Sequence, residues 1–172
     1  MQKINIFLDL EETVIDEWSS CNFLINNISF IKNMINTFSM DLNNQEADNE
    51  NINLILFSAA VSSEKDLLFF REHIQDFLEE QLELVFSDFF IFDIDTLKSL
   101  AKSNQINVLP DDSIQDIFNF NEKEQIFQLI AIENEINILF DDIVENKIIQ
   151  KYNDNLFEKP STLLIQVNTK EV

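Results

Sequence analysis

Residues 4–13 read INIFLDLEET, a short apolar run that ends abruptly at acidic residues. The run is interrupted only by Asn5, and Asp9 and Glu11 follow it at once. A nearly continuous apolar run of about 4–8 residues is typical of a strand buried on both faces of a parallel sheet. The stretch therefore predicts a central strand that carries acidic side chains to the carboxyl edge of a sheet, where open α/β folds bind their ligands.

The rest of the chain alternates between strand patterns and helix patterns. The predicted strands are residues 4–8, 53–57, 82–86, 136–140 and 163–167. The predicted helices are residues 21–40, 64–80, 95–103 (with Asp95 or Thr96 near its start), 121–133 and 144–152. Residues 104–120, around Pro110, show no clear period. This alternation predicts an α/β fold, a Rossmann-like three-layer sandwich whose mostly parallel central sheet is covered by helices on both faces.

The length of 172 residues and an apolar content of 45% predict a single domain over residues 1–172. Residues 41–53 are polar and acidic, and they form the best candidate for a small cap or a flexible acidic loop. The chain contains no glycine, so Asn, Asp, Ser and Pro must make its turns and no glycine-rich phosphate loop exists. The Phe-rich segment 86–92 is expected in the core, or on a partner-binding patch where it is exposed.

Charge favours some partners and disfavours others. Thirty-two acidic residues against 11 basic ones give a formal net charge of −21. A field of that sign repels phosphate backbones, so we expect no long nucleic acid as a partner, whereas metal ions and a basic protein are attracted. The single cysteine, Cys21, fits a reducing cytoplasm, and no apolar run approaches the roughly 20 residues of a membrane span. We therefore expect a cytoplasmic protein that does not bind membranes.

Four short segments in order along the chain place polar residues at the ends of strands or the start of a helix: IFLDLEET at 6–13, LILFS at 54–58, NEKEQIFQLI at 121–130 and INILFDD at 136–142. Together they resemble the motifs of the haloacid dehalogenase (HAD)-like phosphohydrolase superfamily. IFLDLEET looks like the first motif, a strand followed by D-x-D-x-T, with Glu11 where a second Asp is usual. LILFS looks like the second motif, a strand that ends in a hydroxyl residue, here Ser58. Lys123 in NEKEQIFQLI is similar to the lysine of the third motif, and INILFDD at residues 136–142 is similar to the fourth. The compact form is also similar to the phosphatase-like domains of small phage and RNA-repair proteins.

The resemblance implies a phosphohydrolase that cleaves phosphomonoesters through an aspartyl-phosphate. Asp9 would be the nucleophile and Glu11 the acid that protonates the leaving oxygen and then activates water. Ser58 would hydrogen-bond a phosphate oxygen, and Lys123 would neutralise the nucleophile and the phosphate. The substrate would be a phosphorylated small molecule or a phosphoprotein.

The resemblance also implies Mg²⁺ as the cofactor, because a carboxylate cannot approach a phosphate dianion without a cation between them. Asp9, the backbone carbonyl of Glu11 and Asp141 would supply its oxygen ligands. Asp142 would orient the water shell of the metal.

Plainer interpretations of the same residues remain open. Turn formation or helix capping also explains Asp9, Glu11, Ser58 and Asp142. Lys98 and Lys102 are rivals of Lys123 for the motif lysine. Glu11 is one methylene longer than Asp, and a misplacement of about 1 Å can lower a rate on the order of a hundredfold. The alternative function is therefore a catalytically impaired HAD-like binding protein, such as a phage-encoded inhibitor, whose acidic surface engages a basic protein partner.

Overall fold

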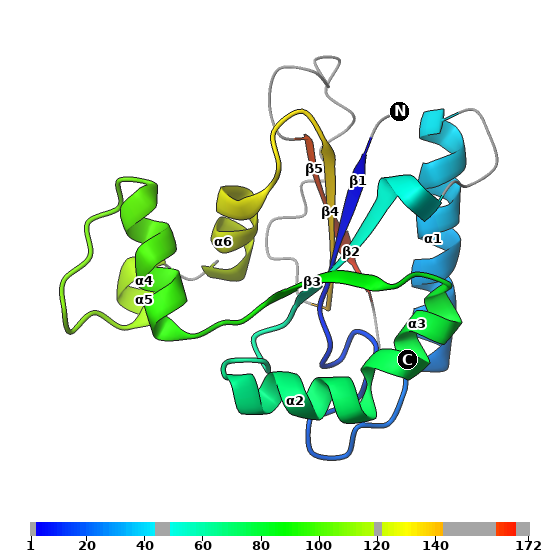
Figure 1. The fold of residues 1–172 in the computed structure, drawn as a ribbon, viewed down its shortest axis with the longest axis horizontal. Helices are drawn as coiled ribbons and strands as arrows, with labels where there is room; N and C mark the ends of the chain where they lie inside the picture. The colour runs from blue at the N-terminus through cyan, green and yellow to red at the C-terminus, as the bar shows by residue number, and fades with distance from the viewer. Residues whose placement is uncertain (1–2, 44–48, 119–121, 143–160, 168–172) are drawn as a thin grey trace.

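A computed structural model of the chain describes residues 3–43, 49–118, 122–142 and 161–167. Its centre is a five-stranded sheet in the order β3-β2-β1-β4-β5, and every neighbouring pair is parallel (Figure 1). The strands are β1 (Ile4–Leu8), β2 (Ile52–Phe57), β3 (Phe86–Phe90), β4 (Ile136–Asp141) and β5 (Ser161–Gln166). The predicted α/β architecture with a parallel sheet is confirmed.

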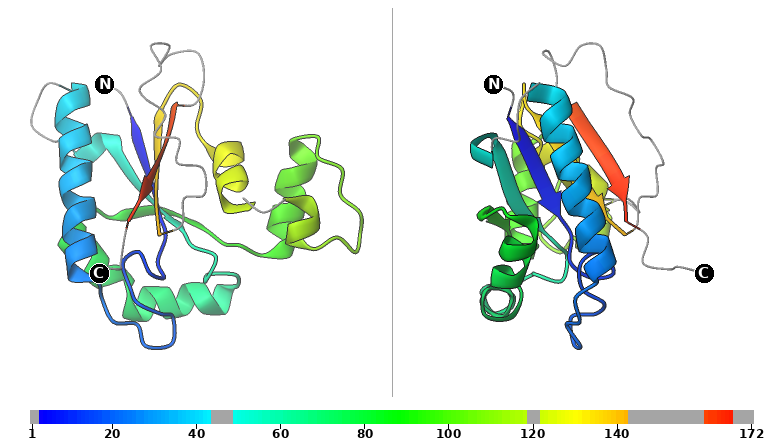
Figure 2. Two further views of the ribbon diagram at one scale, coloured as in Figure 1. Left: turned by 180° about the vertical axis from the view of Figure 1, so that it is seen from behind. Right: turned by 90° about the vertical axis from the view of Figure 1, so that its right-hand side faces the viewer.

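Helices lie on both sides of the sheet (Figure 2). One side carries α1 (Ile25–Asn43), α2 (Glu64–His73) and α3 (Gln75–Leu82), and the other carries α4 (Ile94–Ser103), α5 (Ile114–Ile117) and α6 (Glu122–Ile130). A short 3-10 turn, η1 (Asn49–Asn51), precedes β2. Along β1, Ile6 and Leu8 join the core of the α1–α3 side, whereas Phe7 joins the core of the α4–α6 side. Burial on both faces explains why the apolar run of β1 is almost unbroken.

The strand order changes direction next to β1. From β1 the chain proceeds through β2 to β3 on one side, and then crosses to the other side of β1 to form β4 and β5 (Figure 1). Open α/β sheets bind ligands at such a switch point, beyond the carboxyl ends of the strands. Asp9 directly follows β1 and Asp141 is the last residue of β4. Both acids therefore lie at the switch point.

Asn5, the polar residue inside the β1 run, belongs to a ladder of amides across three strands. It pairs in register with Asn53 on β2 and with Asn137 on β4. The Asn53 amide donates to Asn5 Oδ1 at 2.9 Å, and Asn5 Nδ2 donates to Asn137 Oδ1 at 3.2 Å and to Glu135 Oε2 at 2.7 Å. If one strand shifted by one residue along its neighbour, these amides would lose their hydrogen bonds. The ladder therefore helps to fix the strand register that aligns Asp9 with Asp141.

The predicted strand at residues 82–86 is wrong, and the predicted helix at 64–80 is two helices. The helix breaks at Ile74, and α3 continues to Leu82, after which Glu83 adopts the left-handed conformation with φ of 56°. That position favours glycine, but this chain has none to mark the end of the helix. The edge strand is instead the Phe-rich segment Phe86–Phe90, whose Phe86 is buried and whose Phe89 and Phe90 are half-buried.

Smaller differences concern where elements begin and end. Helix α1 begins at Ile25 and extends to Asn43, so the polar stretch predicted at 41–53 is partly helical, and β2 begins at residue 52. Helix α4 begins at Ile94 because Asp93, rather than Asp95 or Thr96, is the N-cap and accepts the Thr96 N–H at 2.7 Å. Helix α5 forms inside the unassigned 104–120, and the predicted helix 144–152 lies outside the described residues. Within the described ranges, no helix has the length and apolar character to cross a membrane.

Candidate active site

Strand geometry brings Asp9 and Asp141 to the same edge and the same face of the sheet. Each follows directly on one member of the paired residues Leu8 and Phe140, and the Asp9 N–H donates to the Phe140 carbonyl at 3.1 Å. Side chains alternate along a strand, so both acids point to the α4–α6 side, as Phe7 does. Both residues are buried, and carboxylate oxygens of Asp9, Asp141 and Asp142 lie within 4.8 Å of one another. We call these three acids the carboxylate cluster.

Lys123 lies in the first turn of α6 and bridges two acids of the carboxylate cluster. Its Nζ is 2.6 Å from Asp9 Oδ1 and 2.6 Å from Asp141 Oδ2. The structure therefore brings Lys123 together with Asp9 and Asp141. Lys98 is engaged elsewhere, since its Nζ donates to the Pro110 carbonyl at 2.7 Å, and Lys102 is exposed on α4.

The pKa values of Lys123 and Asp9 depend on the charges of the groups around them. Burial raises the pKa of Asp9, and the positive charge of Lys123 only partly opposes that rise. Burial alone would lower the pKa of Lys123, but the carboxylates of Asp9 and Asp141 outweigh it and raise the pKa above its usual value. Lys123 thus stays charged and supplies a fixed positive charge where the two acids meet.

Thr13 orients the Asp9 carboxylate, a role that the sequence analysis did not assign. Its Oγ1 donates to Asp9 Oδ2 at 2.8 Å. A tight turn makes this contact possible, because the N–H groups of Thr13, Val14 and Ile15 all donate to the Leu10 carbonyl. The only sign of this role in the sequence is that Thr13 stands at the threonine position of the first motif. Thr13 and Lys123 together hold both oxygens of the Asp9 carboxylate.

Glu11 has a structural contact that the sequence did not predict. Its Oε2 accepts the backbone N–H of Trp18 at 2.8 Å, and the Trp18 ring packs against Phe69 of α2 with ring centroids 4.8 Å apart. Among the described residues, the carboxylate cluster does not include the Glu11 side chain. The expectation that Glu11 binds a metal through its backbone carbonyl stays a prediction.

Ser58 lies on the strand next to β1, immediately after Phe57. Since Leu8 pairs with Leu56, Ser58 and Asp9 lie at the same edge of the sheet. Ser58 is buried, and its Oγ accepts the N–H of Ala60 at 3.4 Å, while its carbonyl accepts the N–H of Val61 at 3.0 Å. The residue therefore shapes the turn after β2 and also places a hydroxyl at the edge that carries Asp9.

Asp142 has a pKa far above the usual value of an aspartic acid. Burial raises its pKa to about 8, aided by hydrogen bonding to Asp141, by the negative charges of Asp141 and Asp9, and by hydrogen bonding to Glu12. At neutral pH a proton therefore sits between acids that would otherwise repel one another. A divalent cation would relieve the same repulsion, and carboxylate oxygens are the ligands that Mg²⁺ prefers. The residues present thus fit a magnesium ion.

We expect the metal-free protein to lose thermal stability as the pH rises from about 5 to about 8. The pKa of Asp142 rises from 3.8 in the unfolded chain to about 8 in the folded protein. The folded state then binds more protons than the unfolded state between these values, so the free energy of unfolding falls as the pH rises through them.

Melting temperatures measured in EDTA across this range test the expectation. Asp142→Asn should make the melting temperature depend less on pH. MgCl₂ should raise the melting temperature of the wild type more at pH 8 than at pH 5. A wild-type melting temperature that rises steadily toward pH 8 would contradict the assigned protonation.

Comparison with known proteins identified no relative: no protein-family model, curated protein or solved structure matches the chain. Function must therefore be inferred from the site itself.

Proposed function

We propose that this protein is a Mg²⁺-dependent phosphohydrolase of the HAD-like type, which hydrolyses phosphomonoesters through an aspartyl-phosphate on Asp9. The observation that carries the proposal is the Lys123 bridge between Asp9 and Asp141, located at the switch point of the sheet. Phosphoryl transfer needs a positioned nucleophile and neutralised charge more than it needs other covalent chemistry. Asp9, Lys123, Asp141 and Asp142 meet at the switch point, and Ser58 follows the neighbouring strand at the same edge.

In the first step, an Asp9 carboxylate oxygen forms a bond to phosphorus while the bond from phosphorus to the leaving oxygen breaks. The carboxylic acid of Glu11 gives its proton to that leaving oxygen. Thr13 and Lys123 hold the Asp9 carboxylate in one orientation, so little motion is needed at the moment of attack. The Lys123 ammonium also balances negative charge on the phosphoryl oxygens, and the Ser58 hydroxyl donates to one of them.

In the second step, the Glu11 carboxylate takes a proton from water as the water oxygen attacks phosphorus. The bond between phosphorus and Asp9 breaks, phosphate leaves, and both acids return to their starting states. Asp9, Asp141 and the Glu11 backbone carbonyl would hold Mg²⁺, and Asp142 would orient its waters. The bound ion would supply positive charge between the nucleophile and the phosphate. Glu11 must exchange its Trp18 contact for the leaving oxygen during this cycle.

The substrate is a phosphorylated small molecule or a phosphoprotein rather than a long nucleic acid. The loop after β1 carries Glu12, Asp16 and Glu17 close to the site, and no basic residue occurs between Lys3 and Lys32. Three N–H donors from Glu17 and Asn22 bind the Asp16 carboxylate and lower its pKa, so it remains ionised. Repulsion from this loop disfavours polyanions. We place the reaction in the cytoplasm.

A panel of phosphomonoesters assayed with MgCl₂ and with EDTA tests the proposal. We expect phosphate release that requires Mg²⁺ for at least one member of the panel. Absence of turnover on every ester in MgCl₂ would contradict the proposal.

Glu11→Gln is expected to lower kcat by about a hundredfold, the usual scale for the loss of general acid–base catalysis. The glutamine carbonyl can still accept the Trp18 N–H, so the loop should keep its structure. Steady-state kinetics with matched melting curves check this result. Glu72→Gln, an exposed acid on α2, serves as the control and should leave kcat unchanged. If Glu11→Gln turns over substrate at the wild-type rate, Glu11 is not the acid.

The Glu11 contact with Trp18 also supports a second candidate function, a HAD-like binding protein that has lost catalysis. In that case Glu11 serves the loop alone, and the acidic surface engages a basic protein. The phosphomonoester panel separates the two functions, because a binding protein shows no Mg²⁺-dependent turnover while its partner complex weakens as salt screens the charges.

A further inference from the structure

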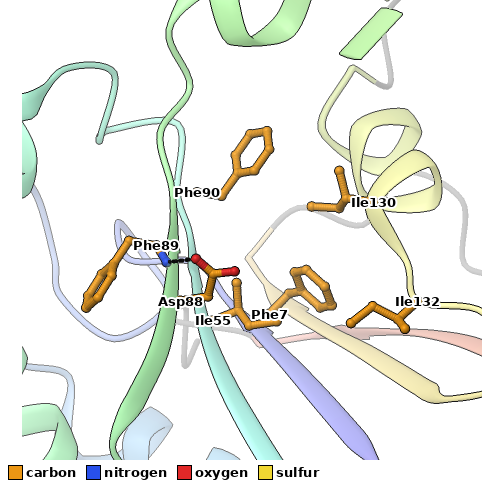
Figure 3. A pocket seen from close by; sticks show the side chains of 7 residues that line it. All are labelled: Phe7, Ile55, Asp88, Phe89, Phe90, Ile130 and Ile132. Atoms are coloured by element: carbon orange, nitrogen blue, oxygen red, sulfur yellow. Dashed lines mark hydrogen bonds between the residues drawn. The ribbon is translucent and has the colours of Figure 1, made fainter. Parts of the chain in front are cut away.

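A pocket of about 140 Å³ lies on the α4–α6 side of the sheet, between β3 and the end of α6 (Figure 3). Phe7 and Ile55 reach it from β1 and β2, and Ile130 and Ile132 close it from the opposite side. The complete lining is Phe7, Ile55, Asp88, Phe89, Phe90, Ile130 and Ile132. Asp88 is the one charged residue of this set, so the pocket is apolar with a single acid.

The volume of the pocket decides what kind of group fits it. Pockets for small-molecule ligands measure about 300–1,000 Å³, whereas an apolar cavity of about 150 Å³ takes a group the size of benzene. This pocket is therefore too small for a metabolite and the right size for one aromatic or branched apolar side chain. A single anchor side chain in a desolvated pocket often dominates the affinity of a protein–protein interface.

A β-bulge brings Asp88 to the pocket. Leu54 pairs with Phe86 but Ile55 pairs with Asp88, so Ser87 is an extra residue in β3. Bulges redirect side chains, and Asp88 lies next to Ile55 with its carboxylate directed toward the pocket (Figure 3). The Asp88 side chain is exposed. With a formal net charge of −21 on the whole chain, the complementary partner carries positive charge.

The edge of β3 disfavours strand pairing with a second copy of this chain. Asp88 Oδ1 accepts the Phe89 N–H at 2.8 Å, and Glu79 Oε2 accepts the Phe86 N–H at 2.7 Å. Acidic groups on an edge strand oppose the addition of another strand, most strongly one from an equally acidic chain. A partner therefore engages the pocket with side chains on the sheet face and does not extend the sheet.

We propose that this pocket anchors a basic protein partner. One aromatic or branched apolar side chain of the partner fills the pocket, and a neighbouring lysine or arginine pairs with Asp88. The pocket is distinct from the carboxylate cluster, although two aromatic side chains, Phe7 and Phe57, lie between them. Phe7 contacts Phe57 at 5.8 Å between ring centroids, and the Phe57 centroid is 5.8 Å from Lys123 Nζ. The proposal does not depend on phosphohydrolase activity.

Acetylated and amidated tripeptides provide the test, with isoleucine methyl NMR spectra of the whole protein as the readout. The probe Lys-Phe-Lys carries both features, Lys-Ala-Lys lacks the ring, and Glu-Phe-Glu reverses the charge. We expect Lys-Phe-Lys to shift the methyl resonances of Ile55, Ile130 and Ile132 with saturation. The other two peptides should bind at least about tenfold more weakly, the scale of losing a buried ring or of meeting a like charge.

Two matched variants test whether Asp88 contributes to the affinity for Lys-Phe-Lys. Asp88→Asn should weaken Lys-Phe-Lys about threefold at low salt, the scale of an exposed ion pair. Asp76→Asn removes an exposed acid from α3 on the other side of the sheet and should leave the affinity unchanged. The proposal would be overturned if Lys-Phe-Lys left the methyl resonances unshifted or if Lys-Ala-Lys bound as tightly as Lys-Phe-Lys. It would also be overturned if Asp88→Asn and Asp76→Asn lowered the affinity for Lys-Phe-Lys equally.

Discussion

Asp9→Asn is expected to abolish phosphomonoester hydrolysis, with kcat falling by a factor on the order of 10⁴ or more, as when other catalytic nucleophiles are removed. An amide oxygen is a poor nucleophile, and the variant also loses one ligand of the proposed metal. The fold should survive, because Lys123 keeps Asp141 as a charged partner and burial already disfavours a charge on Asp9. Phosphate release and melting temperature, measured on the same preparations, check both expectations.

Asp76→Asn makes the same chemical change at an exposed position and should keep wild-type turnover. If Asp9→Asn retains full activity while folded, no covalent route through Asp9 exists and the proposed mechanism is wrong. If both variants lose activity equally, the loss is not specific to the carboxylate cluster.

We expect Lys123→Met to lower both turnover and stability. Magnesium should restore part of the stability but not the turnover. Removing the ammonium takes away the positive charge that lies between the Asp9 and Asp141 carboxylates, and breaking a buried ion pair costs about 3 kcal/mol or more. We expect kcat to fall about 10²–10³-fold, as when other groups that stabilise transition-state charge are removed. Unfolding in urea should show the destabilisation in EDTA and a partial recovery in MgCl₂, without recovery of turnover.

Lys98→Met is the matched control, since Lys98 contacts the Pro110 carbonyl rather than an acid of the cluster. It should leave turnover unchanged and shift stability only slightly. An inactive Lys98→Met together with an active Lys123→Met would show that the lysine has been assigned to the wrong position.

Much of the fold could be predicted because the strands are apolar runs that end at polar residues. Asp9 and Asp141 could be predicted to meet for the same reason, since parallel strands deliver the residues at their carboxyl ends to one edge. Lys123 lies on a helix, and only its similarity to the lysine of the third motif suggested that it joins them. The edge strand could not be placed correctly. Leu82 and Leu84 are both buried, so their spacing imitates a strand although a helix ends there, and no glycine marks the turn at Glu83.

Contacts that depend on irregular backbone could not be predicted either. Thr13 reaches Asp9 because three N–H groups converge on the Leu10 carbonyl, and such a turn has no period in the sequence. Glu12, whose side chain hydrogen-bonds to Asp142, adopts the left-handed conformation with φ of 56°, and no glycine marks that position. The pocket beside Asp88 likewise depends on the bulge at Ser87.

Acid quenching during turnover, followed by mass spectrometry of peptides, tests the central claim most directly. With an ester that the panel shows to be a substrate and MgCl₂ present, the proposed mechanism predicts one added phosphoryl group on the peptide that contains Asp9. The adduct should disappear in EDTA and in the Asp9→Asn variant. Turnover that proceeds with no phosphorylated peptide, or with the phosphoryl group on another residue, would contradict the assignment of Asp9 as the nucleophile.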